Sequence, residues 1–359
     1  MIIGFDGSRA FAEERTGTEN YSYQLLKALL KIDKHNKYIV YTRSNLNFKF
    51  LWTQLGLAIQ TFKDHLDVLF VPAHTLPLIR RPGLKTVVTI HDLGSEYLPD
   101  MYQLKQRLYL SFMQKYQLQT ATKIIAVSKA TKMDLIRKIG VSSEKVRVIY
   151  EGFDKTLFKP VKNNRPKNYF LFVGTVQPRK NLERLIIAFS IHLRGGIFLR
   201  NKAHLGGVTL VIAGGKGWMS DEIYELPKKL GIEDRVKFLG YVPEGDLPAL
   251  YSGAIALTFP SLFEGFGLPI LEAQACGCPV LTSNISSMPE IGGKGAVYVD
   301  PYDVNDIVKG MERLQATACL PARQGYRQQL IKEGFENVKR FSWEKCAAQT
   351  LEVFENLKL

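Results

Sequence analysis

The chain has 359 residues, 46% of them hydrophobic, and a formal net charge of +14. This length favours two domains of ordinary size, and the composition is that of a globular protein. No apolar run approaches the roughly 18 to 20 residues that cross a bilayer, and the start, MIIGFDGSRA, lacks the features of a signal peptide. We therefore expect a cytoplasmic protein.

The positive charge is concentrated in the first half of the chain. Residues 1–166 contain 26 lysines and arginines against 14 acidic residues, whereas residues 167–359 contain 22 against 20. This asymmetry predicts an acidic partner for the first half, either an anionic membrane surface, a phosphorylated lipid acceptor or nucleic acid. Ordinary solubility charge is the alternative. Basic residues recur among apolar ones from Lys105 to Lys132, so a peripheral membrane dock is predicted there, unless this stretch packs inside the first domain.

The first half alternates β-rich runs with helical stretches. Strands are predicted near 1–5, 37–42, 67–72, 85–91, 123–128 and 145–150, and helices over 21–32 and 104–121. Strands interleaved with helices predict a mostly parallel, doubly wound sheet. Ligands of such sheets bind at the carboxyl ends of the strands.

Three strand ends in this half carry unusual residues. The first loop enters a helix near Thr16, where Gly17 would let a phosphate or an acceptor approach; a plain helix entry explains it equally well. His91 and Asp92 follow a strand directly, where a histidine is either structural or chemical. Ser128 follows another strand, and helix capping is the simpler interpretation.

The stretch from Glu151 to Asn168 is rich in lysine and has no periodic apolar face. We interpret it as the linker between two domains. After it, strands are predicted near 168–176, 208–215, 236–242, 254–260, 279–283 and 296–300, with a helix over 181–192 and another ending near 230. An amphipathic helix is predicted over 341–357.

Two cations, Arg179 and Lys180, lie just before a predicted helix whose N-cap would be Asn181. Cations at a helix N-terminus oppose the helix dipole, so this placement favours a bound dianionic group between them. Arginine presents a planar fork to phosphate oxygens and lysine a point charge, a combination suited to a diphosphate. Gly214 and Tyr241 follow two further strands.

The most specific stretch is SLFEGFGLPILEAQACGCPV, from Ser261 to Val280. A buried strand precedes it, Pro269 suits the first turn of a helix, and Gly277 and Pro279 end that helix. Glu264 lies in the loop and Glu272 about one turn into the helix, so two carboxylates flank a helix N-terminus that favours anions or sugar oxygens. Any α/β unit with a glycine turn is the alternative.

The pattern of Glu264, seven residues and Glu272, with Gly265, Phe266, Gly267 and Leu268 between them, resembles the signature of retaining glycosyltransferases of family four. The resemblance implies the GT-B fold, an α/β architecture of two doubly wound Rossmann-like domains facing a central cleft. It divides the chain into an acceptor-side domain (1–160), a donor-binding domain (161–340) and a C-terminal helix (341–359) that packs back on the first domain.

The same resemblance assigns roles to the residues above. It implies that Glu264 and His91 lie beside the donor sugar, that Glu272 binds the ribose, and that Arg179 and Lys180 bind the diphosphate. These four residues, His91, Glu264, Arg179 and Lys180, are the predicted catalytic set. The backbones at Gly214 and Tyr241 would line the nucleobase pocket, while Gly17, Gly265, Phe266, Gly267 and Leu268 complete the predicted donor site.

The implied activity is transfer of a hexose from a nucleotide-diphosphate sugar to a saccharide or lipid-linked acceptor in cell-surface polysaccharide synthesis. The runs GTVQPRKN and IHDL look most like bacterial mannosyltransferases, which favours GDP-mannose over UDP-glucose. No Asp-x-Asp motif occurs in a suitable position, and Cys276, Cys278, Cys319 and Cys346 lack zinc-ligand spacing, so no metal is expected.

Three alternative functions fit the sequence less well. A glycosidase also uses two carboxylates around a sugar, but it needs no cationic diphosphate site. A sugar-nucleotide epimerase of GT-B fold is disfavoured by the signature from Glu264 to Glu272. A non-catalytic nucleic-acid-binding protein is disfavoured because no known module appears, and the basic residues are not interleaved with stacking aromatics. We therefore expect no nucleic-acid partner.

Overall fold

The structure, a computed structural model, describes residues 1–11, 17–42, 52–73, 75–94, 115–161, 168–195, 207–320 and 323–357. The chain divides into two compact units. The first comprises Met1–Gly152 and Phe341–Leu359, and the second Phe153–Arg340. The segment from 153 to 161, expected as part of a linker, is therefore counted with the second unit, where Phe153 and Phe158 are buried.

The first unit is built on a six-stranded sheet with the strand order β2-β1-β3-β4-β5-β6, and all its pairings are parallel. Its strands are β1 (Ile2–Asp6), β2 (Lys37–Tyr41), β3 (Val68–Val71), β4 (Lys85–Ile90), β5 (Lys123–Ala126) and β6 (Val146–Val148). Nearly every residue of β1, β3, β4 and β5 is buried, as expected for parallel strands covered on both faces.

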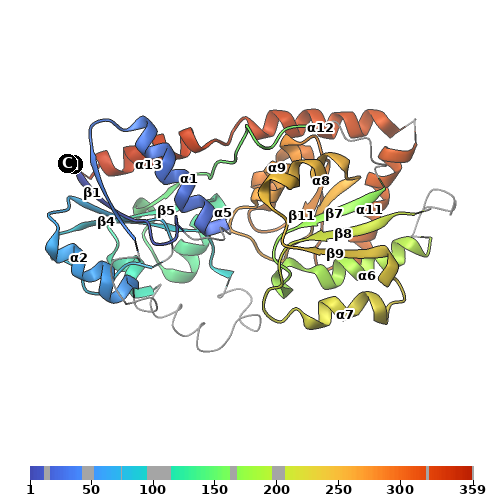
Figure 1. Cartoon of the computed structure of the whole chain (residues 1–359), viewed down its shortest axis with the longest axis horizontal. Helices are drawn as coiled ribbons and strands as arrows, with labels where there is room; N and C mark the ends of the chain where they lie inside the picture. Colours follow the sequence, from blue (N-terminus) through green and yellow to red (C-terminus); the bar gives the residue numbers. More distant parts are fainter. Residues whose placement is uncertain are drawn as a thin grey trace. The chain divides into compact units, whose positions relative to one another are not determined.

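Helices and tight turns connect these strands (Figure 1). They are α1 (Gly17–Ile32), the π-helical turn η2 (Trp52–Leu57), α2 (Ala58–Lys63), α5 (Lys129–Asp134), η4 (Leu135–Ile139) and the 3-10 turn η5 (Ser143–Lys145). Residues 115–120 are also helical, whereas most of the helix predicted over 104–121 lies outside the described residues.

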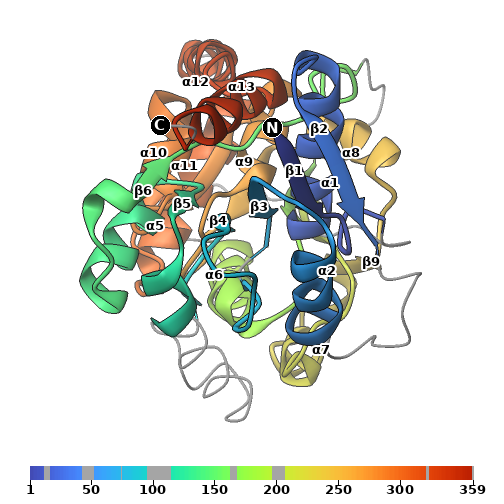
Figure 2. The same cartoon turned by 90° about the vertical axis from the view of Figure 1, so that its left-hand side faces the viewer.

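The C-terminal helix α13 (Trp343–Glu355) belongs to the first unit and packs against α1 (Figures 1 and 2). Its Phe354 is fully buried and meets Phe70 of β3 edge to face, with ring centroids 5.2 Å apart. Trp343 meets Tyr21 of α1 in the same way, at 5.8 Å. The first unit is thus completed by the last helix of the chain.

The second unit has a parallel sheet with the order β12-β11-β10-β7-β8-β9. Its strands are β7 (Tyr169–Val173), β8 (Thr209–Ala213), β9 (Val236–Gly240), β10 (Ala256–Phe259), β11 (Val280–Ser283) and β12 (Ala296–Val299). Each strand predicted from the sequence, in both halves, is found at its expected place, with bounds that differ by at most three residues.

The helices of this unit are α6 (Leu182–Leu193), α7 (Asp221–Lys229), α8 (Leu247–Gly253), α9 (Leu268–Ala275), α10 (Met288–Gly292), α11 (Val304–Cys319) and α12 (Gln324–Val338). Short 3-10 turns occur at η6 (Pro178–Lys180), η8 (Glu233–Arg235), η9 (Glu244–Asp246) and η10 (Gly293–Gly295). The predicted α/β class with two doubly wound sheets is confirmed.

Candidate functional site

The strand order of the second unit marks one place in its sheet. From β7 the chain moves outward through β8 to β9, then returns to β10 beside β7 and continues outward on the other side to β12. The connections that leave β7 and β10 therefore diverge, and ligands of doubly wound sheets bind at this switch point, beyond the carboxyl ends of the strands. Turn η6 follows β7, and the loop with Glu264 follows β10.

Three charged side chains meet at the switch point. Lys180 Nζ lies 2.5 Å from Glu264 Oε1, and Arg179 NH1 lies 3.1 Å from Glu264 Oε2. Arg179 also donates to the carbonyl of Phe263 at 3.0 Å. Lys180 and Glu264 are buried, and Lys180 Nζ lies 5.0 Å above the Phe259 ring. The structure thus brings together the predicted diphosphate ligands and the predicted sugar-side carboxylate.

Burial alone would raise the pKa of the Glu264 carboxyl. The positive charges of Lys180 and Arg179 outweigh this effect and hold its pKa below the ordinary value. Glu264 is therefore ionised at neutral pH, and the cluster of two cations and one carboxylate carries a net charge of about +1. Such a cluster attracts an anion while keeping both cations oriented.

The side chain of Asn181 connects the loops of the switch point. The sequence predicted instead that it caps a helix. It occupies the N-cap position of α6, but its side chain makes no capping bond. Instead its amide donates to the carbonyls of Pro260 (2.9 Å) and Pro301 (2.7 Å), while its backbone adopts a φ of 61°. Asparagine tolerates this left-handed conformation better than most residues.

Two serines that the sequence analysis missed support the Glu264 loop. Ser286 and Ser287 donate to the carbonyl of Glu264 at 2.6 and 2.9 Å, and Ser287 also lies 2.9 Å from the carbonyl of Phe266. Both follow β11, the strand next to β10. The signal in the sequence that could have indicated these serines is the run of polar residues after a predicted strand. These bonds restrain the backbone that presents Glu264.

Glu272 lies in α9 and faces Tyr251 of α8. The Tyr251 hydroxyl donates to Glu272 Oε2 at 2.7 Å. Burial raises the pKa of the Glu272 carboxyl to about 7, although the hydrogen bond from Tyr251 lowers it and the charge of Glu244 adds to the increase. Glu264 and Glu272 thus differ in charge at neutral pH, because only Glu264 has cationic partners.

The predicted glycines lie at the same edge of the sheet. Gly214 follows β8, and a Cβ there would come 1.9 Å from the carbonyl oxygen of Gly174, which follows β7. Gly267 is the N-cap residue of α9 with a φ of 116°. Tyr241 directly follows β9 with a 65% exposed side chain.

Other predicted donor-site residues belong to the Glu264 loop and α9. Gly265 and Phe266 are buried in that loop, and Leu268 is the first residue of α9. The helix therefore begins four residues after Glu264, and its positive dipole end lies beside the cluster.

His91, in the first unit, contacts residues of the same unit. Its Nδ1 lies 3.0 Å from Glu151 Oε1, its Nε2 lies 2.9 Å from the carbonyl oxygen of Pro72, and its ring meets Tyr21 edge to face at 4.6 Å. Burial alone would lower the pKa of His91, but the hydrogen bond and charge of Glu151 raise it above the ordinary value. Acceptors at both nitrogens favour the doubly protonated ring.

The remaining predicted residues of the first unit have local roles in the structure. Ser128 caps α5 by accepting from the backbone N–H of Thr131 at 3.0 Å, which confirms the capping interpretation. Asp92 accepts from the backbone of Gly94. Gly17 is the first residue of α1, and among the residues that the structure describes a Cβ there would meet none within 4 Å. Thr16 lies outside the described residues.

The basic stretch from Lys105 to Lys132, the predicted membrane dock, is not one continuous element in the structure. Lys105 and Arg107 lie outside the described residues, Lys123 begins β5, and Lys132 lies in α5. The ammonium groups of Lys123 and Lys132 donate to the backbone carbonyls of Glu144 and Val146. Those two lysines therefore support the fold of the first unit.

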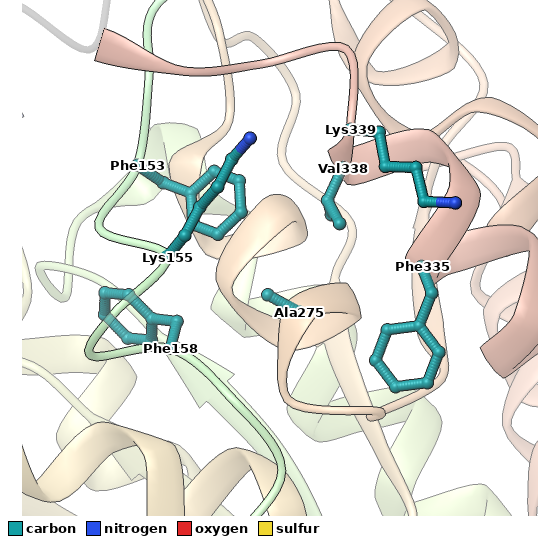
Figure 3. Close-up of a pocket in the computed structure, with 7 residues that line it drawn as sticks. All are labelled: Phe153, Lys155, Phe158, Ala275, Phe335, Val338 and Lys339. Carbon is teal, nitrogen blue, oxygen red and sulfur yellow. The ribbon is translucent and has the colours of Figure 1, made fainter. Parts of the chain in front are cut away.

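A small pocket in the second unit lies apart from the predicted site (Figure 3). Its volume is about 170 Å³, and its walls are mainly apolar, from Phe153, Phe158, Ala275, Phe335 and Val338. None of the predicted site residues lines it.

Within the described residues, no group of three or more His, Cys, Asp or Glu side chains is arranged to hold a metal ion. Cys276, Cys278 and Cys346 are free thiols in buried positions. No helix in the described part of the chain is both long and apolar enough to span a membrane.

Comparison with protein families gives two matches that together cover most of the chain. Residues 153–337 match the model described as "Glycosyl transferases group 1", and residues 9–157 match "Glycosyltransferase Family 4". Among similar proteins, the O-antigen chain mannosyltransferase B of Escherichia coli is 30% identical over 284 residues, which covers 76% of this chain and 71% of that protein. The O-antigen chain mannosyltransferase RfbU of Salmonella typhimurium is 31% identical over 268 residues, covering 74% and 69%.

Solved structures resemble the whole chain. Sucrose-phosphate synthase from Thermosynechococcus elongatus aligns with a TM-score of 0.77 at 22% identity, covering 99% of this chain and 98% of that one. WaaG, a glycosyltransferase involved in lipopolysaccharide biosynthesis, aligns with a TM-score of 0.72 at 14% identity over 99% of both chains. Anabaena HepE in complex with UDP-glucose aligns with a TM-score of 0.70 at 20% identity over 99% of both chains. These likenesses confirm the GT-B fold.

Proposed function

Because the chain belongs to the family-four, group 1 glycosyltransferases, we propose that it transfers mannose from GDP-mannose to a saccharide or lipid-linked acceptor, with retention of the donor's α-configuration. The product would contribute to a cell-surface polysaccharide. The first mannosyltransferases matched are O-antigen enzymes at about 30% identity, which supports the choice of mannose over the glucose of the HepE complex. The proposed place of action is the cytoplasm, at the inner face of a membrane.

The observation that carries this proposal is the cluster of Arg179, Lys180 and Glu264 at the switch point. Transfer from a nucleotide sugar breaks the bond between the anomeric carbon and the diphosphate, and negative charge builds on the leaving oxygen. Two oriented cations beside the positive end of α9 stabilise that charge more in the transition state than in the ground state. In this proposal these groups supply the positive charge, and no metal ion is required.

The other residues at the sheet edge have proposed roles in holding the donor. Glu272 would accept hydrogen bonds from the ribose, and the backbones at Gly214 and Tyr241 would lie against the base. Glu264 would lie beside the sugar, where its ionised carboxylate stabilises positive charge that develops on the sugar ring. This arrangement suits a transition state with oxocarbenium character.

His91 and Gly17 are the proposed contributions of the first unit. In the structure both ring nitrogens of His91 already have partners, so a bond to the donor sugar would replace the one to Pro72. Gly17 begins α1, and a Cβ there would meet none of the described residues within 4 Å, which permits a phosphate or acceptor to approach. His91 is proposed as a contact of the donor sugar, and Gly17 as part of the loop beside donor and acceptor.

The cluster is tested by removing its charges in pairs. Lys180→Met together with Glu264→Gln removes one cation and the carboxylate and leaves Arg179 bonded to the carbonyl of Phe263, and Arg179→Gln removes the second cation. We expect each variant to reduce turnover by about 100-fold or more, since oriented groups of this kind contribute on that scale. Lys229→Met is the matched control, because Lys229 pairs with Glu225 at the surface of the same unit. A folded paired variant with the turnover of the parent would contradict the assignment.

The donor and the stereochemistry need separate measurements. Incubation with GDP-mannose, GDP-glucose and UDP-glucose, with transfer followed by nucleotide release and product mass, identifies the donor. The anomeric proton coupling of the product in an NMR spectrum reports its configuration. A β-linked product from an α-linked donor would refute retention, and an epimerised nucleotide sugar without transfer would identify an epimerase.

A further inference from the structure

An exposed apolar surface lies on the first unit, far along the chain from every predicted site residue of the second unit. The residues 52–63 form a continuous helical stretch, η2 followed by α2. One side of it is buried, through Trp52, Leu57 and Thr61. The opposite side presents large apolar side chains where a water-facing helix would normally present polar ones. Figure 1 shows α2 at the margin of this unit.

Five large apolar side chains form this surface, which we call the α2 surface. They belong to the helical stretch and to the segment after β3, and they are Leu55, Ile59, Phe62, Leu78 and Ile79. Phe62 is 52% exposed and Ile79 is 72% exposed. Single exposed apolar residues are common on proteins, but several gathered on one side mark an interaction surface.

Hydrogen bonds bring the two segments of the α2 surface together. The Gln54 side chain donates to the carbonyl of Leu76 at 3.1 Å and accepts from the backbone N–H of Leu78 at 2.9 Å. Farther along the helix, Thr61 Oγ1 accepts from the backbone N–H of Arg81 at 3.2 Å. The segment from Leu76 to Arg81 therefore runs alongside the helix, and its Leu78 and Ile79 are exposed.

Three cations flank the α2 surface. Lys63 ends α2, and Arg80 and Arg81 follow Ile79 directly. Arg80 donates to the carbonyls of Pro77 and Thr120, and Arg81 to the carbonyl of Leu66. Because these acceptors are backbone oxygens, they orient the guanidinium groups without neutralising them. Within the described part of the chain, no carboxylate forms an ion pair with any of the three cations.

We propose that the α2 surface docks reversibly on an anionic lipid bilayer. Apolar side chains that enter the boundary between headgroups and acyl chains, flanked by cations that meet lipid phosphates, are the two features of interfacial membrane binding. A purely apolar protein partner would leave the three charges without counterparts. The excess of basic residues in the first 166 residues of the chain also favours binding to an anionic bilayer.

This surface replaces the stretch from Lys105 to Lys132 as the proposed point of membrane contact. In that stretch, Lys123 and Lys132 bond to backbone carbonyls of the first unit. The two arginines of the α2 surface also bond to backbone carbonyls, so the difference lies in the five exposed large apolar side chains of that surface. Vesicle binding requires no sugar donor, so its test is independent of the proposed transfer reaction.

The test is flotation of the full-length chain with vesicles of phosphatidylcholine, with and without phosphatidylglycerol, at low and high salt. We expect binding only to the anionic vesicles, and weaker binding at high salt because ions screen the attraction. The combined change Ile59→Gln, Phe62→Gln and Ile79→Gln should lower partitioning about tenfold or more, since these side chains would remain in water. Lys63→Glu should lower it at least roughly fivefold.

Matched controls separate the α2 surface from general effects. Leu30→Gln changes a 48% exposed leucine in α1, and Lys31→Glu changes a lysine that, like Lys63, lies in the last turn of a helix of the first unit. Both controls should float like the parent, and all variants should keep its melting temperature. Equal flotation of the α2-surface variants and the parent would overturn the proposal. So would equal binding to neutral and anionic vesicles, or a parent that ignores vesicles and instead forms dimers that these substitutions dissociate.

Discussion

Two ionisable side chains, one in each unit, have partners that their sequence positions do not reveal: His91 is buried and Glu272 is partly buried. His91 was predicted from the end of a strand, yet its Nδ1 partner, Glu151, lies 60 residues later. Glu272 was predicted as a ribose ligand, and its partner in the structure is Tyr251. Both environments raise the pKa of the residue, so each makes stability depend on pH in a specific window.

The pair of His91 and Glu151 should stabilise the first unit mainly at lower pH. Since the folded pKa of His91 is raised, its contribution is fully present below the unfolded value of about 6.5 and is lost as pH rises through the folded value. Glu151→Gln should lower the free energy of unfolding near pH 6 by about 3 kcal/mol and remove this pH dependence. Chemical denaturation across pH measures it, with exposed Glu144→Gln as control. An unchanged pH profile in Glu151→Gln would show that the pair is not charged.

Glu272 should make stability depend on pH in the direction opposite to that of an acid paired with a cation. Its folded pKa of about 7 exceeds the usual 4.5, so the folded state keeps a proton that the unfolded state has already lost. Stability should therefore fall as pH rises from about 4.5 to 7, by at most about 1.4 kcal/mol per pH unit. Glu272→Gln should flatten that part of the curve, whereas exposed Glu222→Gln should not. A parent protein whose stability rises through this window, with no change in Glu272→Gln, would contradict the raised pKa.

At the scale of elements, the loops after β7 and β8 approach too closely for side chains. A Cβ on Gly214 would lie 1.9 Å from the carbonyl oxygen of Gly174, whereas a Cβ on the neighbouring Gly215 would meet nothing within 4 Å. The Gly214 backbone also donates to the carbonyl of Gly240 at 2.8 Å, so it has little freedom to move away. The two adjacent glycines form a natural pair of test and control.

Gly214→Ala should lower the free energy of unfolding by roughly 3 kcal/mol, because the backbones after β7 and β8 must separate. Gly215→Ala should change it by less than about 0.5 kcal/mol. Urea denaturation followed by circular dichroism measures both. If the two variants are equally stable, the close approach of Gly214 and Gly174 is not a constraint on the fold.

At the scale of the whole molecule, the chain returns to its first unit after completing its second. Phe354 of α13 is fully buried against Phe70 of β3 in the first unit. Phe354→Ala should destabilise that unit by about 3 to 5 kcal/mol through the cavity it leaves. Hydrogen exchange should then increase in peptides from 1–152 and 341–357, while peptides from 153–340 keep their protection. Phe62→Ala, at an exposed phenylalanine, is the control, and equal loss of protection in both units would contradict the division.

Local patterns in the sequence determined the strands, the α/β class and the main candidates of the site. Twelve strand positions followed from apolar runs and turn residues, because each pattern depends only on neighbours along the chain. The glycines and proline around Glu264, and the cations before α6, were recognisable for the same reason. The loop after a strand is where a doubly wound sheet places its ligands, so these residues could be selected before their neighbours were known.

Only the tertiary structure decided which of these residues meet. Glu264 pairs with cations 84 and 85 residues earlier because β10 lies beside β7, a strand order that no local pattern encodes. The same holds for Glu151 beside His91, for the serines under the Glu264 loop, and for the exposed side of α2. Contacts and exposure depend on how distant segments pack. The sequence therefore predicted the chemistry of single positions, and the fold determined their partners, charges and surfaces.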